Sequence, residues 1–363
     1  MIYLYFAVAF AALCFWQFRL KDWSATGIAA IVGFVAVLAC YYVPLYWTAS
    51  DEEILSGSVM KKERVYDPYT ETYTCGTDSH GNPKTCTRLV DQWRWDVISD
   101  YGDSFSEHTS QKVRAPAIYA ATQLGDPYAS TKKFMNYQNV SEQSVMIDRE
   151  SAKEYRGWVP EYPHIYAGFK VSRGFSNTPF MDQRGLSHFL SVAQKRWGPM
   201  HGVNVSVVVL DHRTDWNGFT NALASKWKGG KKNDAVLVLG LDEKGATIHA
   251  WAFSRSADEK TDERGRNFTK ALYENAHDAL MEKRGPIDVN TIIDSIDKSL
   301  VLFQREDLGR YDFLKDEYVP GWPAMILSFI IICAIVSITV KQSCDYLDRN
   351  GGYRRMYRRR GLM

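Results

Sequence analysis

The longest apolar runs of this chain carry no charged residue at all. They cover residues 2–18, 25–47 and 323–340. A hydrocarbon core about 30 Å thick needs about 20 helical residues to cross it, and none of these runs shows the polar stripe of a surface helix. We therefore predict three transmembrane helices. The first is expected to be a retained anchor, because a cleaved signal peptide begins with a basic region and Met1–Tyr5 has no charge.

Between these runs, the pattern of apolar positions changes twice. Residues 50–115 contain segments that alternate large apolar and polar side chains, as half-buried strands do, and Gln92–Val97 is the clearest of them. This part is expected to be β-rich. Residues 116–179 contain several prolines and many tyrosines but no clean period, so we expect an ordered, loop-rich connection.

From residue 180 to residue 320, helical and strand-like spacings follow one another. Two near-continuous apolar runs, 203–210 and 235–241, are typical of strands covered on both faces. A third strand is expected at 247–253. Apolar residues at helical spacing predict helices around 186–197, 219–227, 268–280 and 288–304. The order α-β-α-β-β-α-α predicts a compact α/β sandwich.

Charge gives the predicted membrane helices a direction. The formal net charge is +2, but the tail 341–363 holds seven basic and two acidic residues. Short basic loops stay on the cytoplasmic side of a membrane. This predicts an inner-membrane protein with its N-terminus outside, residues 50–320 periplasmic or extracellular, and the tail cytoplasmic. Anionic lipid is the expected partner of the tail arginines, with nucleic acid as the less favoured alternative: Arg354, Arg355, Arg358, Arg359 and Arg360.

Two cysteines, Cys75 and Cys86, fall within the region predicted to be exported. Strand-like residues flank them, and His80–Pro83 has the composition of a turn. A hairpin would bring the two cysteines within disulfide reach, and an oxidising compartment favours their pairing. A metal or redox site is an alternative, but a zinc site usually takes four ligands and a catalytic dithiol is usually CxxC. Free thiols are a second alternative.

Residues 180–303 resemble the TPM domain, a small α/β module usually tethered to a membrane. The resemblance rests on the helix before Val203–Leu210, on the segment Ala224–Gly230, and on Lys232–Leu239. The chain departs from that family at Asn233-Asp234-Ala235, where a glycine is usual. The whole arrangement is also similar to uncharacterised membrane proteins of tailed bacteriophages and some bacteria. Some TPM proteins are associated with phosphatase activity and divalent metals, so the resemblance implies that either property is worth testing here.

Three carboxylates are candidates for such chemistry. Asp211 and Asp242 each follow one of the two buried strands, and Asp215 begins the helix between them. If these strands are parallel, their carboxyl ends share one edge of the sheet, where ligands usually bind. Carboxylate oxygens suit Ca²⁺ or Mg²⁺. The alternative is structural, with Asp211 and Asp242 in turns and Asp215 as a helix cap.

The chain has no complete catalytic motif: GxSxG, HExxH and a GxGxxG that follows a strand are all missing from the sequence. The favoured function is therefore a membrane-anchored, exported interaction module that binds an envelope protein and is encoded by a phage or bacterium. A weak metal-dependent phosphohydrolase built on the three aspartates is the first alternative. A lysis or transport accessory role is the second.

Overall fold

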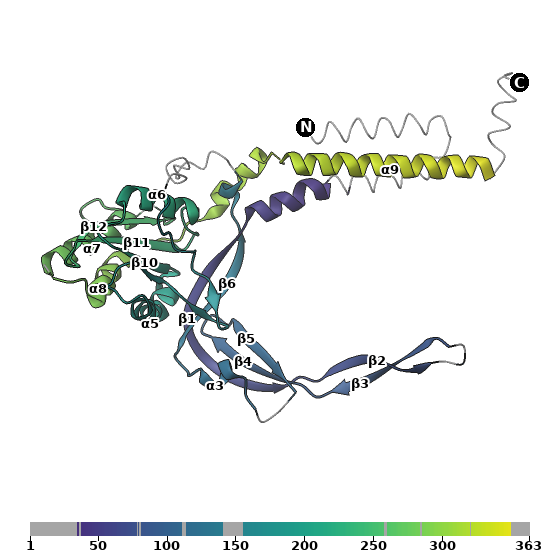
Figure 1. The fold of residues 1–363 in the computed structure, drawn as a ribbon, viewed down its shortest axis with the longest axis horizontal. Coiled ribbons are helices and arrows are strands. Elements are labelled where there is room, and N and C mark those ends of the chain that lie inside the picture. Colours follow the sequence, from purple (N-terminus) through teal and green to yellow (C-terminus); the bar gives the residue numbers. More distant parts are fainter. Residues whose placement is uncertain are drawn as a thin grey trace, which may run out of the picture. The chain divides into compact units, whose positions relative to one another are not determined.

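The computed structural model describes residues 35, 38–77, 79, 81–110, 114–140, 155–257, 260–283, 285–319 and 321–349. The chain separates into two compact units. The larger unit spans 51–134 and 145–308, and the smaller one combines 1–50, 135–144 and 309–363. Both four-stranded sheets belong to the larger unit (Figure 1).

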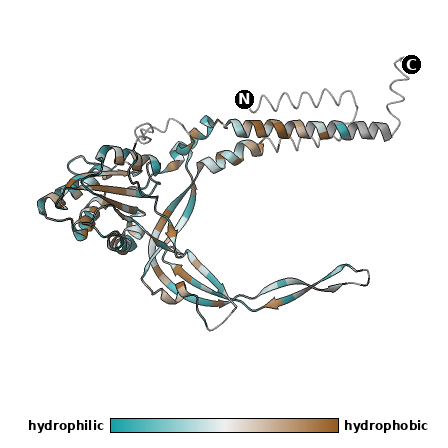
Figure 2. Ribbon diagram, in the orientation of Figure 1, coloured by the Kyte–Doolittle hydropathy of each residue, from teal (hydrophilic) through white to brown (hydrophobic). Residues whose placement is uncertain are grey.

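The larger unit contains a four-stranded mixed sheet in the order β12-β11-β10-β9. β10 (Asn204–Leu210) runs parallel to β11 (Asp234–Leu241) and to the short β9 (Gly174–Ser176), whereas β12 (Thr247–Ser254) is antiparallel to β11. Every residue of β10 and β11 is buried, as the near-continuous apolar sequence predicts for strands covered on both faces. Figure 2 shows this concentration of hydrophobic residues in the central strands.

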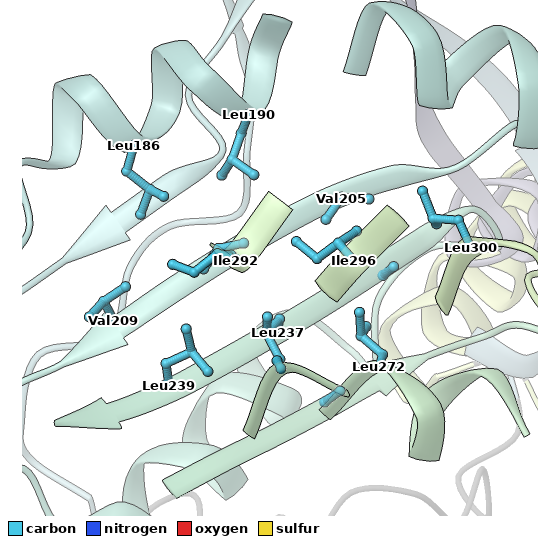
Figure 3. Close-up of a cluster of buried hydrophobic side chains, with 14 of the residues drawn as sticks. Leu186, Leu190, Val205, Val209, Leu237, Leu239, Leu272, Ile292, Ile296 and Leu300 are labelled. Carbon is cyan, nitrogen blue, oxygen red and sulfur yellow. The ribbon is translucent and has the colours of Figure 1, made fainter. Parts of the chain in front are cut away.

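Helices cover both faces of this sheet. On one face, α5 (Gln183–His201), α7 (Phe268–Lys283) and α8 (Val289–Leu300) contribute to a single core that includes Leu190, Leu272 and Ile296 (Figure 3). On the other face, α6 (Trp216–Lys226) places Phe219 and Leu223 against β10 and β11. The layers are thus helices, sheet and helix.

The elements predicted between residues 186 and 303 are all present and in the predicted order. The helical spacing of apolar residues alone would place Phe189 on the inward face of α5 and Ala279 on that of α7. Instead, Phe189 is 47% exposed, and Ala276 rather than Ala279 is buried in α7.

A second sheet precedes the α/β part, in the order β5-β4-β1-β6. Its strands are β1 (Ser50–Tyr66), β4 (Trp93–Ser99), β5 (Ser104–Thr109) and β6 (Pro127–Met135). A small core of Val59, Val97, Tyr128 and Phe169 lies on it, with Ile118 and Tyr119 of α3 (Ala117–Ala121) packed against that core. The β-rich character predicted for 50–115 is confirmed, but the sheet also takes β6 from the segment predicted to be loops.

The remaining ordered elements are short or belong to the smaller unit. β2 (Tyr69–Thr77) and β3 (Pro83–Val90) form one two-stranded hairpin, and β7 (Ile165–Tyr166) and β8 (Lys170–Val171) form another. In the smaller unit, residues 38–49 are helical, followed much later by η2 (Leu308–Glu317) and α9 (Trp322–Arg349). Tyr41 and Tyr318 meet edge to face there, with ring centroids 5.5 Å apart. The 3-10 turn η1 (Tyr137–Asn139) also belongs to this unit.

The structure corrects the prediction of membrane helices. Within the described ranges, no helix combines the length and the apolar character that crossing a bilayer requires. The spans predicted at 25–47 and 323–340, and the inner-membrane topology built on them, are therefore wrong for the described part of the chain. Lack of charge within a run was too weak a criterion: α9 continues past the predicted end at Val340 to Arg349 and takes in Lys341, Asp345 and Asp348. The predicted span 2–18, residues 25–34 and 36–37 of the second predicted span, and the five tail arginines lie outside the described residues.

Candidate interaction surface

Cys75 and Cys86 lie at the closed end of the β2–β3 hairpin, which we call the arm (Tyr69–Val90). Their Cα atoms are 5.6 Å apart, and their sulfur atoms are within bonding distance. The predicted disulfide is therefore compatible with the structure. The strands pair antiparallel from Tyr69 opposite Val90 to Thr77 opposite Pro83, with a bulge between Thr74 and Gly76. The disulfide thus closes a hairpin, as the turn residues between the cysteines suggested.

The arm continues β1 and β4, the two central strands of the sheet β5-β4-β1-β6. β1 pairs with β4 as far as Tyr66 opposite Trp93, and the Asp67 amide donates to the Gln92 carbonyl oxygen at 2.9 Å across the junction. β5 accompanies β4 only as far as Trp93. Beyond that point only the two strands of the arm continue (Figure 1). The arm therefore lacks the neighbours that cover the other strands.

One face of the arm, the tyrosine face, carries Tyr69, Glu71, Tyr73 and Arg88. The Arg88 Nε donates to Glu71 Oε2 at 2.8 Å across the strands, and the Arg88 guanidinium lies 5.3 Å from the centre of the Tyr73 ring. Tyr69 and Tyr73 remain 46% and 41% exposed. Since opposed residues in an antiparallel pair share a face, these contacts order the side chains without burying them.

The opposite face of the arm, the threonine face, has no charged residue. Thr72 lies opposite Thr87, Thr74 opposite Thr85, and Thr70 opposite Leu89. All six side chains are exposed, and Leu89 reaches 68% exposure. The alternation of threonine in Thr70-Glu-Thr-Tyr-Thr74 could have revealed this face from the sequence. Such a flat, β-branched, uncharged surface favours packing against another strand or sheet.

At the base of the arm, aromatic rings alternate with a cation. The Tyr66 and Trp93 ring centroids are 4.9 Å apart, and the Arg64 guanidinium lies 5.2 Å from the Trp93 ring and 5.5 Å from that of Trp95. The Tyr66 hydroxyl donates to Asp91 at 2.6 Å, and this hydrogen bond raises the pKa of Tyr66. Tyrosine, tryptophan and arginine are the residues enriched in the energetic centres of protein interfaces.

Two of the three candidate metal ligands, Asp211 and Asp242, are engaged in their own turns. Asp211 accepts from the Arg213 amide at 3.0 Å, and Asp242 accepts from the amides of Lys244 and Ala246, both at 2.8 Å. These backbone hydrogen bonds lower the pKa of Asp242. Asp215 is the N-cap residue of α6. Over the described ranges, no three histidine, cysteine or acidic side chains are grouped to hold a metal ion, so a Ca²⁺ or Mg²⁺ site stays a prediction.

A buried polar network at the other end of β10 and β11 was not predicted. Asp234 accepts hydrogen bonds from the Tyr162 hydroxyl and Asn204 Nδ2, both at 2.8 Å, and from the Lys231 amide at 2.7 Å. Burial nevertheless raises the pKa of Asp234. Arg173 Nε donates to Asn204 Oδ1 at 3.1 Å, and burial lowers the pKa of Arg173 to about 10. Arg173 therefore remains charged at neutral pH.

The first half of β1 joins this network. Ser56 accepts a hydrogen bond from Arg173. Glu53, which is fully buried, forms ion pairs with Arg305 and with Lys232, whose Nζ is 3.2 Å from Glu53 Oε1. These partners lie far apart in the sequence, so no local sequence pattern predicts their contacts. The network fastens β1, which leads to the arm, against the α/β sheet.

Comparisons with known proteins do not identify the chain. No protein-family model matches it, and no curated protein sequence matches it either. The resemblance to the TPM domain therefore stays a prediction.

Proposed function

We propose that this chain is a protein-binding module and that the arm is its binding element. The observation that carries the proposal is the exposure of the arm: β2 and β3 are rich in β-branched and aromatic residues, yet almost every position is exposed. Residues of this kind are usually placed where a strand can bury one face. The arm covers no core of its own among the described residues, so a partner is the natural source of that burial.

The construction of the arm supports this role. An isolated two-stranded hairpin is marginally stable in water. Here the Cys75–Cys86 pair closes the tip, and the Glu71–Arg88 pair joins the strands midway. A preorganised arm loses less conformational entropy on binding than a flexible loop does. The tyrosine face then offers rigid aromatic side chains and an arginine, the combination typical of binding hot spots.

The phosphohydrolase alternative has no comparable support. Its three aspartates serve turns or a helix start, and the observed hydrogen bonds explain why acidic residues occur at Asp211 and Asp242. The lysis or transport role depended on membrane helices and is not taken further. Binding through the arm therefore accounts for the most distinctive feature of the described chain.

Site-specific photo-crosslinking tests the proposal in the full-length chain. A photoreactive phenylalanine analogue replaces Tyr73 on the arm, and a matched control replaces Met281 on α7, which is 47% exposed. In extract of the source cells, we expect a discrete protein adduct from position 73. Excess wild-type chain should compete it away, whereas a Tyr69→Ser, Arg88→Ser competitor should not. Equal labelling from positions 73 and 281, or equal competition by both chains, would show that the arm is not the binding element.

A further inference from the structure

The outer edge of β2 is the part of the arm with the clearest unused bonding capacity. β1 lies between β4 and β6, but in the described structure the following strand, β2, pairs with β3 alone. The other edge of β2 therefore presents backbone N–H and C=O groups that another strand can pair with. Natural proteins often protect such edges with lysine or proline. Within Tyr69–Thr74 the single charged residue is Glu71.

The regular part of this edge is short and its limits are defined. Pro68, which precedes β2, has no amide hydrogen to donate, and the bulge between Thr74 and Gly76 interrupts the strand at its other end. Tyr69–Thr74 is left for pairing. Within it, threonine occupies positions 70, 72 and 74, so the threonine positions are symmetric about Thr72.

We propose that the strand added to this edge is β2 of a second copy of the chain, antiparallel and related by a two-fold axis at Thr72. The product is a four-stranded sheet in which the two β2 strands are central and the two β3 strands are outermost. This inference rests on the proposed function of the arm and names one of its partners. The two threonine faces join into one uncharged surface, and the two tyrosine faces join on the other side.

Charge and strand geometry select the centre of the pairing. A two-fold axis at Glu71 would place two carboxylates directly opposite each other, which destabilises a strand pair. An axis at Tyr73 would run the pairing into the bulge after Thr74. An axis at Thr72 avoids both problems. It places Thr70 opposite Thr74 of the second copy, and Glu71 opposite Tyr73 of the second copy.

The size of the contact predicts a weak association. Cross-strand pairs contribute about 0.2–1 kcal/mol each, and five residues on each strand cover far less than the roughly 800 Å² per partner of a standard interface. The dimer should therefore form reversibly and dissociate on dilution. Covalent crosslinking is therefore better suited to detecting this dimer than a measurement of molecular size alone.

Cysteine crosslinking tests the register. In the full-length chain, Cys14, Cys40, Cys333 and Cys344 are replaced by serine, and the Cys75–Cys86 pair is kept. Paired residues on adjacent strands have Cα atoms about 4.5–5.5 Å apart, within disulfide reach. Thr72→Cys should therefore give a disulfide-linked dimer under mild oxidation, with a yield that falls on dilution.

Matched variants fix the geometry. Thr87→Cys lies on the same exposed face, but in the proposed dimer its two copies are three strand spacings, about 14 Å, apart, so it should remain monomeric. Thr70→Cys mixed with Thr74→Cys should give a crosslinked heterodimer, whereas each alone should crosslink much less. Sedimentation equilibrium gives a second test in chains that carry no introduced cysteine. Thr72→Lys should weaken dimerisation, and Thr87→Lys should not.

The outcomes separate this inference from the proposed function. Failure of Thr72→Cys to crosslink, or crosslinking of Thr87→Cys at an equal rate, would overturn pairing through β2. Failure of the mixed Thr70 and Thr74 variants would overturn the register. In either case, the arm would remain a binding element if the photoreactive residue at position 73 crosslinks a different protein and excess wild-type chain prevents that crosslink. The proposed function itself fails when position 73 gives no specific adduct, with a second copy or with any other protein.

Discussion

Replacing Gly198 by alanine tests the contact that holds β1 against α5. Gly198 lies near the end of α5, and a Cβ atom built there would be 1.8 Å from the Ser56 carbonyl oxygen and 2.7 Å from its carbonyl carbon. Both neighbours are backbone atoms, so a side-chain rotation cannot relieve the overlap. Helix and strand would have to separate by roughly 1.2–1.6 Å to restore a tolerable contact of 3.0–3.4 Å.

Two contributions destabilise the Gly198→Ala variant, and one stabilises it. Forcing an extra methyl group into a packed contact costs about 1–3 kcal/mol. Moving Ser56 also disturbs its hydrogen bond from the buried Arg173, and hydrogen bonds to charged groups contribute about 1.5–3 kcal/mol. Alanine recovers about 0.8–1 kcal/mol of helix propensity relative to glycine. The net loss is roughly 2–5 kcal/mol, which lowers the Tm of a unit of this size by roughly 5–15 °C.

Thermal unfolding of the full-length chain, followed by circular dichroism, measures this loss. Met200→Ala is the control, because Met200 lies in the same helix and is 68% exposed; its effect should stay within about 0.5 kcal/mol. A Gly198→Ala chain that melts at or above the wild-type temperature would refute the close approach of α5 and β1. Equal losses in both variants would instead point to a general effect of substitution in α5.

Three further changes probe the arm, the buried network and a helix cap. Cys75→Ser should remove about 2–3 kcal/mol of arm stability and speed tryptic cleavage within the arm; unchanged cleavage would show that the disulfide does not hold it. Arg173→Met should cost about 2–4 kcal/mol in urea unfolding, because Asn204 and Ser56 lose a buried charged partner; a neutral result would contradict the network. A hydrogen bond from the Thr291 hydroxyl lowers the pKa of Asp288 from 3.8 to about 2, so its contribution is complete above pH 3.8 and is lost as the pH falls toward 2. Asp288→Asn should flatten the fall in Tm over that range, and an unchanged slope would exclude Asp288 as its source.

The α/β part could be predicted because its sequence signals are local. β10 and β11 are uninterrupted apolar runs, and α8 carries isoleucine and leucine at helical spacing. β6 was missed because its first half is buried and its second half is exposed, so it shows no alternation. It begins at Pro127, a residue tolerated at the first position of a strand. β9 has three residues, too few to form any pattern.

The candidate site was predictable in part. The turn between Cys75 and Cys86 indicated a hairpin, and the cysteines lie together as expected. The described structure does not group the three aspartates: hydrogen bonds from nearby backbone amides hold the carboxylates of Asp211 and Asp242 in their own turns. The sequence analysis recognised that these positions follow strands and gave turns as the structural alternative, but the residue pattern does not show which backbone amides reach a carboxylate.

β1 connects the buried network with the arm along its whole length. Its 17 residues span about 55 Å at the usual rise of a strand. Glu53 and Ser56, in the first half, are bonded to charged residues of the α/β part. Arg64 and Tyr66, in the second half, pair with β4 next to the arm. Because one continuous strand carries both sets of contacts, weakening the network should disturb the base of the arm even though no residue of the arm changes. Hydrogen exchange of the Trp93–Ser99 amides in Arg173→Met would show this: faster exchange there supports mechanical continuity along β1, and exchange at the wild-type rate would show that the two halves of the strand are held independently.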